Sequence, residues 1–335
     1  MPIFNEGEFI KRSLGAVEAQ DYPIDQLEVI VVDGLSTDNT REIVRSMRAT
    51  NLPIELIDNP ARIVPIGMNL ALKHAKGEVI IRVDGHCEIA RDYVRRCVEY
   101  LQKNQTDGVG GYVETIGETP IAGVIALAMS SPFGVGDCSF RILKGKTRMV
   151  DTVPFPAYRK NIIERAGLYD EEFIRNQDDE YNYRLRKMGT KIMLVRDVHA
   201  RYYSRSSLRS LWRQYFQYGY WKVRVLQKHP RQMRLRQFVP PAFVAALMGS
   251  YLFAWLFPLG WGLFIGLSAA YILANVAASV WTAFQKGLRN LMLLPLVFSI
   301  LHISYGSGFL VGLVKFRNRW GDKKGKVPEA ERTNV

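Results

Sequence analysis

A stretch of 48 consecutive residues, Phe238 to Gln285, contains no Lys, Arg, Asp or Glu. A membrane-spanning helix needs about 20 apolar residues, so this stretch predicts two such helices with a turn at Phe257 to Trp261. A soluble helix of that length would show a polar face. Residues Asn290 to Val314 also lack these charged side chains and carry one histidine, His302. We therefore expect a membrane protein with a transmembrane region over residues 237–314.

Positive charge gathers in the same part of the chain. The net charge is +13, yet no Asp or Glu stands between Asp197 and Asp322, where fifteen Lys and Arg are found. Outside this interval the basic and acidic side chains nearly balance. We interpret residues 201–236 as basic and aromatic interfacial helices facing anionic lipid, and residues 315–335 as a basic polar tail. The charge pattern indicates a membrane partner and no nucleic acid.

The first part of the chain, to about residue 200, alternates between short β-branched runs and amphipathic segments. This alternation predicts an α/β domain over residues 1–200 with a doubly wound, mostly parallel sheet. The expected strands are Leu27–Val32, Ile54–Asp58, Val79–Val83 and Val109–Thr115, and the expected helices are Gly7–Glu18, Thr37–Met47, Ile66–Ala75, Ala90–Gln102 and Asp170–Lys187.

Two of these strands end on an aspartate followed by glycine. One run ends at Asp33 and the other at Asp84, and His86 follows the second. Ligands of open α/β sheets bind at the carboxyl ends of the strands. Two carboxylates and an imidazole there suit a nucleotide whose diphosphate is carried on a divalent metal. Two ordinary Asp-Gly turns are the alternative explanation.

Seven short motifs together resemble one protein family. They are Pro2 to Glu6, Gln20 to Pro23, Val31 to Thr40, Ala61 to Asn69, Asp84 to His86, Asn176 to Glu180 with Arg184 and Leu185, and Gln214 to Trp221. As a set they resemble the inverting glycosyltransferases of family 2, which have the GT-A fold. They are most similar to bacterial exopolysaccharide transferases of the succinoglycan ExoA type. The resemblance covers about residue 2 to about residue 315.

The resemblance implies a nucleotide-sugar pocket near the start of the chain. By the match, Asp33 is the carboxylate that hydrogen-bonds the nucleotide base, with Pro2, Asn5 and Glu6 as its companions. Arg62 is placed to meet a phosphate, although an exposed salt bridge also explains it.

The resemblance also implies a divalent metal, Mn²⁺ or Mg²⁺, that would neutralise the donor diphosphate. Asp84 and His86 are the expected ligands, and Asp84 also belongs to the donor site. The family pattern is usually Asp-x-Asp, and a histidine in the third place favours a borderline metal such as Mn²⁺. Alternatively, His86 is a turn residue that caps the next helix.

The catalytic base implied by the match is Asp178. The residue before it, glutamate in the family, is Gln177 here. Asp179 and Glu180 remain rivals for the role. Acidic residues that favour the dipole of a helix start are the alternative explanation for all three.

A mixed aromatic and basic segment, Arg205 to Lys222, precedes the apolar region. Gln214, Tyr218 and Trp221 stand where processive synthases carry Gln-x-x-Arg-Trp, but the sequence departs from that motif, which favours a non-processive enzyme. The segment either holds the pyrophosphate of the acceptor or forms an amphipathic belt in the headgroup region.

The expected function is that of a membrane-anchored inverting glycosyltransferase of exopolysaccharide synthesis. It would transfer a sugar, with UDP-glucose as the expected donor, to a polyprenyl-diphosphate-linked saccharide on the cytoplasmic side of a bacterial inner membrane. The alternatives are a polyprenyl-phosphate monosaccharide synthase and a catalytically inactive scaffold of an assembly complex.

Two further expectations concern the first strand of the sheet and the third apolar segment. An apolar strand should precede Pro2, so we expect the first strand of the sheet to be missing. The third apolar segment, 290–314, is interrupted by Pro295 and by Ser304 to Gly308, so we expect it to enter the membrane and return as two half-helices. A complete third span with an exported basic tail is the alternative.

Overall fold

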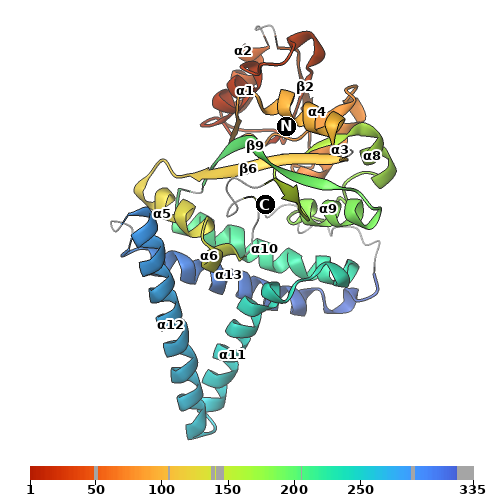
Figure 1. Ribbon diagram of the computed structural model, residues 1–335. Helices are drawn as coiled ribbons and strands as arrows, with labels where there is room; N and C mark the ends of the chain where they lie inside the picture. The colour runs from red at the N-terminus through yellow and green to blue at the C-terminus, as the bar shows by residue number, and fades with distance from the viewer. Residues whose placement is uncertain are drawn as a thin grey trace. The chain divides into compact units, whose positions relative to one another are not determined.

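The computed structural model describes residues 1–48, 52–104, 106–136, 140, 147–204, 206–287 and 291–322. It divides into two compact units (Figure 1). The sheet unit contains Met1–Glu114 and Ser139–Tyr203, and the helical unit contains Thr115–Cys138 and Ser204–Gly325.

The sheet unit begins with a three-stranded parallel sheet. Its strands are β1 (Pro2–Ile3), β2 (Val29–Asp33) and β3 (Ile54–Asp58), in spatial order β1-β2-β3. Every residue of β2 is buried, as expected for the central strand of a covered parallel sheet. At the position expected for the end of a first strand, Pro2 and Ile3 pair with Val32 and Asp33, and the expectation of further strand residues before Pro2 stays a prediction.

Four helices accompany these strands in sequence: α1 (Ile10–Glu18), α2 (Thr40–Met47), α3 (Val64–His74) and α4 (Tyr93–Lys103). In α1 the residues Ile10, Leu14 and Val17 repeat at helical spacing and are buried in the same hydrophobic cluster as β2. This apolar stripe explains why the segment folds as a helix against the sheet.

A second sheet contains β4 (Val79–Ile81), β5 (Cys87–Ile89), β6 (Gly108–Ile116), β7 (Arg148–Met149), β8 (Ala157–Arg159) and β9 (Ile192–Tyr203). Its order is β4-β8-β6-β9-β5, and β7 also pairs with β9. Strands β4 and β6 each pair antiparallel with β8. Strands β5 and β7 each pair antiparallel with β9. Parallel pairing thus holds for β1 to β3, whereas β4, which leads to Asp84, belongs to this second sheet.

Helices α8 (Lys160–Ala166) and α9 (Gln177–Lys187) complete the sheet unit. Helix α9 begins later than the expected start at Asp170. The reason is Asn176, whose left-handed backbone (φ 63°) immediately precedes the first helical residue. Tyr181 of α9 stacks on Tyr169 with 4.0 Å between ring centroids.

The helical unit contains α5 (Pro120–Met129), α6 (Pro132–Val135), α10 (Leu208–Lys228), α11 (Val239–Ala254), α12 (Pro258–Lys286) and α13 (Leu294–Lys315). Short 3-10 turns occupy Pro230–Gln232, Leu235–Phe238 and Arg317–Arg319. Leu235–Ala254, Pro258–Gln285 and Leu294–Lys315 are each long and apolar enough to cross a membrane.

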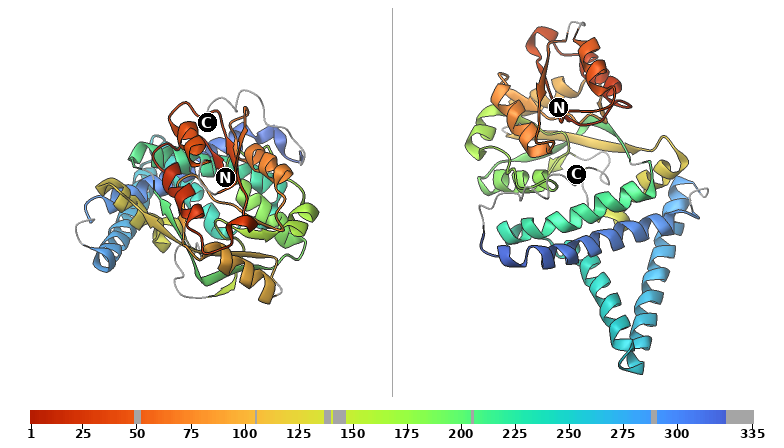
Figure 2. Two further views of the ribbon diagram at one scale, coloured as in Figure 1. Left: turned by 90° about the horizontal axis from the view of Figure 1, so that it is seen from above. Right: turned by 180° about the vertical axis from the view of Figure 1, so that it is seen from behind.

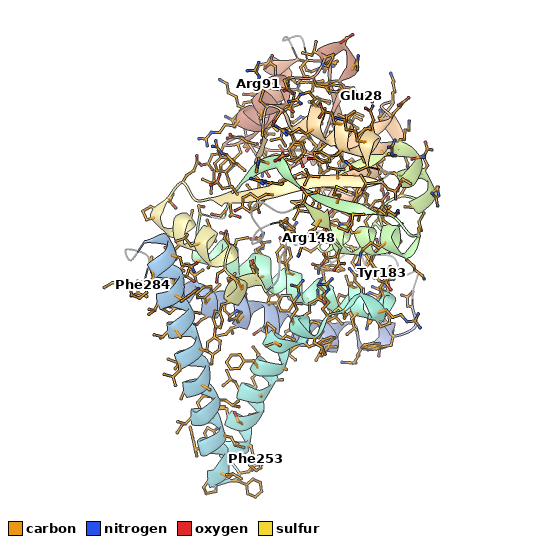
Figure 3. All side chains as sticks on the ribbon, in the orientation of Figure 1. Glu28, Arg91, Arg148, Tyr183, Phe253 and Phe284 are labelled. Atoms are coloured by element: carbon orange, nitrogen blue, oxygen red, sulfur yellow. The ribbon has the colours of Figure 1, made fainter. Side chains whose placement is uncertain are left out.

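Helices α11 and α12 form the expected hairpin, and their outward side chains are apolar. Leu256 at its turn is 76% exposed, and Phe284 near the end of α12 is 72% exposed. Figure 3 shows Phe284 pointing away from α12 and Phe253 at the hairpin tip. Water would oppose such exposure, so lipid is the expected surrounding of this hairpin.

Helix α13 is continuous from Leu294 to Lys315, so the expectation of two half-helices is wrong. Pro295 stands in the first turn, where the missing N–H costs no hydrogen bond. Gly308 lies inside the helix and lets α10 approach: a Cβ there would be 2.0 Å from the Phe216 carbonyl oxygen. Helices α10 and α13 accordingly lie side by side (Figures 1 and 2).

His302 of α13 is also part of the helical packing. Its Nε2 lies 2.8 Å from the carbonyl oxygen of Phe133 and its Nδ1 lies 3.0 Å from the hydroxyl of Tyr271. A carbonyl can only accept, so Nε2 carries the proton and Nδ1 accepts from the tyrosine. His302 therefore links α6, α12 and α13.

Candidate active site

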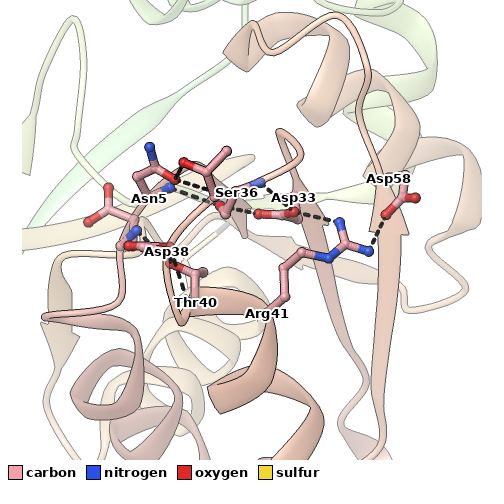
Figure 4. A network of polar contacts seen from close by, with 9 residues as sticks. Asn5, Asp33, Ser36, Asp38, Thr40, Arg41 and Asp58 are labelled. Carbon is pink, nitrogen blue, oxygen red and sulfur yellow. Dashed lines mark hydrogen bonds and ion pairs between the residues drawn. The ribbon is translucent and has the colours of Figure 1, made fainter.

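The loops after β1 and β2 are tied together by hydrogen bonds (Figure 4). The Asn5 backbone N–H donates to the Ser36 hydroxyl, and the Asn5 side-chain oxygen accepts from the Thr37 N–H, both at 2.9 Å. The Glu6 N–H donates to the Thr40 hydroxyl at 2.8 Å. The structure therefore places Asn5 and Glu6 beside the loop that follows Asp33. Pro2 pairs with Val32 on the strand that ends at Asp33, and the nucleotide-binding role of these residues stays a prediction.

Asp33 is fully buried, and both of its carboxylate oxygens have protein partners. One accepts from the Ser36 hydroxyl, and the other accepts from the Ser36 N–H at 3.0 Å and from Arg41 at 2.7 Å. Arg41 also contacts Asp58 at 2.8 Å. Sequence reading missed Arg41, although its position in the first turn after the strand-end loop is a signal that a cation is near.

Arg62 lies on the solvent side of this region. Its guanidinium carbon is 5.7 Å from the centroid of the Phe4 ring, and its backbone is left-handed (φ 58°). Among the described residues Arg62 forms no ion pair, so the alternative of an exposed salt bridge is not seen there. An exposed cation over an aromatic ring remains a candidate contact for a nucleotide.

Arg82, which sequence reading also missed, joins the two predicted acidic groups. Its Nε and Nη2 lie 2.8 and 3.3 Å from the two oxygens of Asp84, and its Nη1 contacts Asp178. The Arg82 side chain is 9% exposed, that of Asp84 is 21% exposed and that of Asp178 is 46% exposed. The fork of Arg82 therefore places the candidate donor-site and base carboxylates on one guanidinium.

The pKa values of Asp84 and Asp178 shift in opposite directions. For Asp84, burial works to raise the pKa, but the positive charges of Arg82, His86 and the chain's N-terminus together outweigh it and hold the pKa below its ordinary value. For Asp178 the pKa is raised, because desolvation of the carboxylate and repulsion from Asp84 and Asp179 outweigh the attraction of Arg82, although almost half of the side-chain surface is exposed. A carboxylate with a raised pKa accepts a proton more readily, which suits a base.

Of the acidic residues that begin α9, Asp178 contacts Arg82. Glu180 is 2% exposed and is paired with Arg184 at 2.6 Å. Arg184 also donates to the carbonyl oxygens of Ala166 and Leu168, so Glu180 has a structural partner. Asp179 lies beside Asp178 and adds to its electrostatic surroundings.

His86 is paired with Glu6 and not with Asp84. Its Nδ1 lies 2.8 Å from a carboxylate oxygen of Glu6, and its ring meets Tyr202 edge-on with 5.1 Å between centroids. Metal-binding histidines usually donate their second ring N–H to a carboxylate in this way. The candidate ligand atom of His86 is therefore Nε2, and Glu6 is its orienting carboxylate.

The residues present fit a divalent cation shared with a substrate. No group of three or more His, Cys, Asp and Glu side chains in the described chain could hold a metal on its own. Mg²⁺ is commonly held by one or two protein side chains together with substrate phosphates and water. Asp84 and Nε2 of His86 match that smaller set, with Mn²⁺ suited to the mixed oxygen and nitrogen ligands.

The predicted acceptor residues lie on α10 of the helical unit. Gln214 donates through Nε2 to the Tyr218 hydroxyl at 2.9 Å, and its buried Oε1 has no hydrogen-bond partner among the described residues. Trp221 is 4% exposed, with its ring centroid 5.6 Å from that of Phe316. Trp221 therefore packs between α10 and the end of α13, which explains its presence without an acceptor.

Comparison with known proteins decides the family. The family described as "Glycosyl transferase family 2" matches residues 1–212 of this sequence. The chain belongs to glycosyl transferase family 2. The resemblance inferred from the seven motifs is confirmed.

Two relatives match nearly the whole chain. The succinoglycan biosynthesis protein ExoA of Rhizobium meliloti is 29% identical over 323 residues, which cover 95% of both chains. A Methanococcus voltae enzyme, dolichyl N-acetyl-alpha-D-glucosaminyl phosphate 3-beta-D-2,3-diacetamido-2,3-dideoxy-beta-D-glucuronosyltransferase, is 26% identical over 331 residues, covering 94% of this chain and 96% of the relative. The protein is a membrane-associated family 2 glycosyltransferase of glycan synthesis.

Solved structures establish the GT-A-like fold. The Pyrobaculum calidifontis mannosyltransferase PcManGT, in complex with GDP-Man and Mn²⁺, has a TM-score of 0.56 and 21% identity, covering 92% of this chain and 85% of its own. The TarS 1-349 structure of S. aureus with UDP has a TM-score of 0.50 and 16% identity, covering 95% and 90%. At these identities the likeness concerns the fold.

Proposed function

We propose that this family 2 glycosyltransferase transfers one sugar, with inversion, from a nucleotide-sugar donor to a lipid-linked saccharide. The expected donor is UDP-glucose, and the expected acceptor is a polyprenyl-diphosphate-linked saccharide of exopolysaccharide synthesis. The observation that carries the proposal is the meeting of Asp84 and Asp178 on Arg82. The Methanococcus voltae relative, named as a transferase for a dolichyl phosphate-linked sugar, supports a lipid-linked acceptor.

In the proposed reaction an acceptor hydroxyl attacks the anomeric carbon of the donor. Asp178 takes the hydroxyl proton on one of its carboxylate oxygens while the new glycosidic C–O bond forms. The bond between the anomeric carbon and the diphosphate oxygen breaks, and the nucleoside diphosphate leaves with the electron pair. Attack from the side opposite the leaving group inverts the anomeric centre and gives a β-linkage from an α-linked donor.

Other residues of the sheet unit have proposed roles around that step. Asp84 and His86 would hold Mn²⁺ or Mg²⁺, which supplies positive charge to the leaving diphosphate when it is bound. Glu6 would fix the tautomer of His86. Asn5, Asp33 and Arg62 would bind the nucleotide, with Asp33 acting from its position beside Arg41.

The proposed setting is a bacterial inner membrane with the sheet unit on the cytoplasmic side. Basic residues flank the apolar region on both sides in sequence, from Arg201 to Arg236 and again from Lys315. Such residues favour the cytoplasmic face. Gln214 and Tyr218 would then meet the acceptor near the membrane surface.

The test is transfer of radiolabelled sugar from UDP-glucose to lipid in membranes that contain the full-length protein. Asp178→Asn should lower turnover by about 10²- to 10⁴-fold, the typical effect of losing a general base, with UDP binding retained. The matched control, Asp179→Asn, should be milder. Chelation of divalent cations should silence the wild type. A dead Asp179→Asn variant beside an active Asp178→Asn variant would contradict the assignment.

A further inference from the structure

We propose that Arg82 is a positioning residue that sets the separation and orientation of Asp84 and Asp178. Its three guanidinium nitrogens each face a carboxylate oxygen: two face Asp84, and one faces Asp178. The inference rests on the proposed function of those two acids. Neither the family match nor the motifs assign a role to Arg82.

The guanidinium is held by the fold before any ligand binds. Arg82 directly follows β4, and its backbone N–H donates to the Pro156 carbonyl oxygen at 3.1 Å. Its side chain is 9% exposed, so it has little freedom to leave the two acids. Because the Arg82 backbone is fixed and its guanidinium is planar, the guanidinium sets the positions of both carboxylates.

Helix α9 and the segment before it have anchors that do not involve Arg82. Asn69 donates to the Tyr169 carbonyl oxygen at 3.0 Å and accepts from the Tyr169 N–H at 2.8 Å, which fixes the segment leading to α9. Asn182 of α9 donates to Thr152 at 2.7 Å and accepts from the buried Tyr158 hydroxyl. Loss of Arg82 should therefore release the Asp178 side chain while α9 stays in place.

The geometric consequence concerns Asp178, whose side chain is more exposed than that of Asp84. One oxygen of Asp178 is held by Arg82, and no second hydrogen-bond or ion-pair partner among the described residues orients this 46% exposed side chain. With Arg82 in place, the carboxylate presents its other oxygen in a fixed direction relative to Asp84. A base displaced by about 1 Å can cost about 10²-fold in rate.

Kinetics of Arg82→Lys and Arg82→Met test the role. Lysine keeps the charge but has no planar fork, so Arg82→Lys should lower kcat by about 10²-fold, a larger effect than on the donor KM, which changes because Asp84 belongs to the donor site. Arg82→Met should lower kcat further. The control is Arg95→Met, which removes a surface arginine paired with Asp21 and Glu99 and should keep wild-type kcat. Wild-type kcat in Arg82→Lys would overturn the proposal.

A thermal-unfolding cycle tests the contact without relying on activity. Arg82→Met leaves Asp84 and Asp178 facing each other without their shared cation, and Asp178→Asn removes that repulsion. The double variant should therefore lose less in melting temperature than the sum of the two single losses. Additive losses would overturn the shared contact, even if Arg82→Met folds poorly.

The two experiments separate this inference from the proposed function. If the wild type transfers no sugar from UDP- or GDP-sugars, the proposed function fails, and the cycle still decides whether Arg82 joins the two acids. If the wild type is active while Arg82→Lys matches it and the cycle is additive, the positioning role fails and the proposed function stands.

Discussion

The pairing of Glu6 with His86 predicts how strongly the candidate cation site binds Mn²⁺. Its carboxylate faces Nδ1 of His86 at 2.8 Å, and both side chains are 18% exposed. Loss of such an orienting carboxylate typically costs about 10- to 100-fold in metal affinity. We expect Glu6→Gln to raise, by that factor, the Mn²⁺ concentration needed for half-maximal UDP binding measured by calorimetry.

The matched control is Glu8→Gln, because Glu8 is an exposed carboxylate two residues along the same loop. It should leave the Mn²⁺ dependence unchanged. If Glu6→Gln and Glu8→Gln behave alike, the pair between Glu6 and His86 has no part in holding the cation.

The acidic residues of the site were easier to predict from sequence than their partners. Asp33 ends strand β2 and Asp84 comes shortly after β4, so both could be found from local pattern, and Asp178 was proposed by resemblance. Arg82 lies two residues before Asp84 in sequence, but its contact with Asp178 joins residues 96 positions apart. Such pairing is decided by tertiary packing, which strand and helix periodicity does not contain.

Among the elements, the packing of α10 against α13 depends on glycines at the contact. A Cβ at Gly308 would lie 2.0 Å from the Phe216 carbonyl oxygen, and one at Gly219 would lie 2.0 Å from that of Tyr305. Backbone atoms in a helix cannot move aside as the end of a flexible side chain can, so an added Cβ would clash with these carbonyl oxygens. We therefore expect Gly308→Ala to destabilise the protein by about 1–3 kcal/mol, the usual cost of overpacking.

The control for this prediction is Gly266→Ala in α12, where nothing lies within 4 Å of an added Cβ. Alanine favours a helix by about 1 kcal/mol over glycine, so this change should be neutral or stabilising. Thermal unfolding of both variants in detergent is the measurement. Equal melting temperatures for Gly308→Ala and Gly266→Ala would refute the close contact.

Elements with a strong local pattern were predicted well, and the others were not. Strand β3 occupies Ile54–Asp58 as expected, and the apolar hairpin turns near Phe257. Strand β9 was missed, although its residues 194, 195, 198 and 200 are buried, because polar residues break a strict alternation. The start of α9 was placed too early because nothing in the acidic pattern reveals the left-handed Asn176.

For the molecule as a whole, the question is whether the third apolar segment crosses the membrane, because three spans would export the basic tail. The packing of the helical unit bears on this question. Half of the apolar window of α13 is buried within the structure, against 22% and 11% for the other two candidate spans. Helix α13 runs in the same direction as α10, since Gly308 meets Phe216 and Gly312 meets Tyr220.

Helix α10 carries basic residues along its length, so it is suited to the membrane surface and not to the hydrocarbon core. Helix α13 packs along α10 for several turns, so we expect the two helices to lie at the same depth. We expect two helices, α11 and α12, to cross the membrane while α13 stays at the surface. This arrangement keeps Lys315, Arg317 and Arg319 on the side from which the chain enters α10, as the positive-inside rule requires.

Cysteine labelling on intact cells tests this topology. In a variant whose three native cysteines are replaced, a cysteine is placed at Leu256, in the hairpin turn, or at Trp320, which follows α13 and is 55% exposed. A membrane-impermeant maleimide should label Leu256→Cys from outside. It should label Trp320→Cys only after the membrane is permeabilised. Labelling of Trp320→Cys from outside would show that α13 crosses the membrane and exports its basic end.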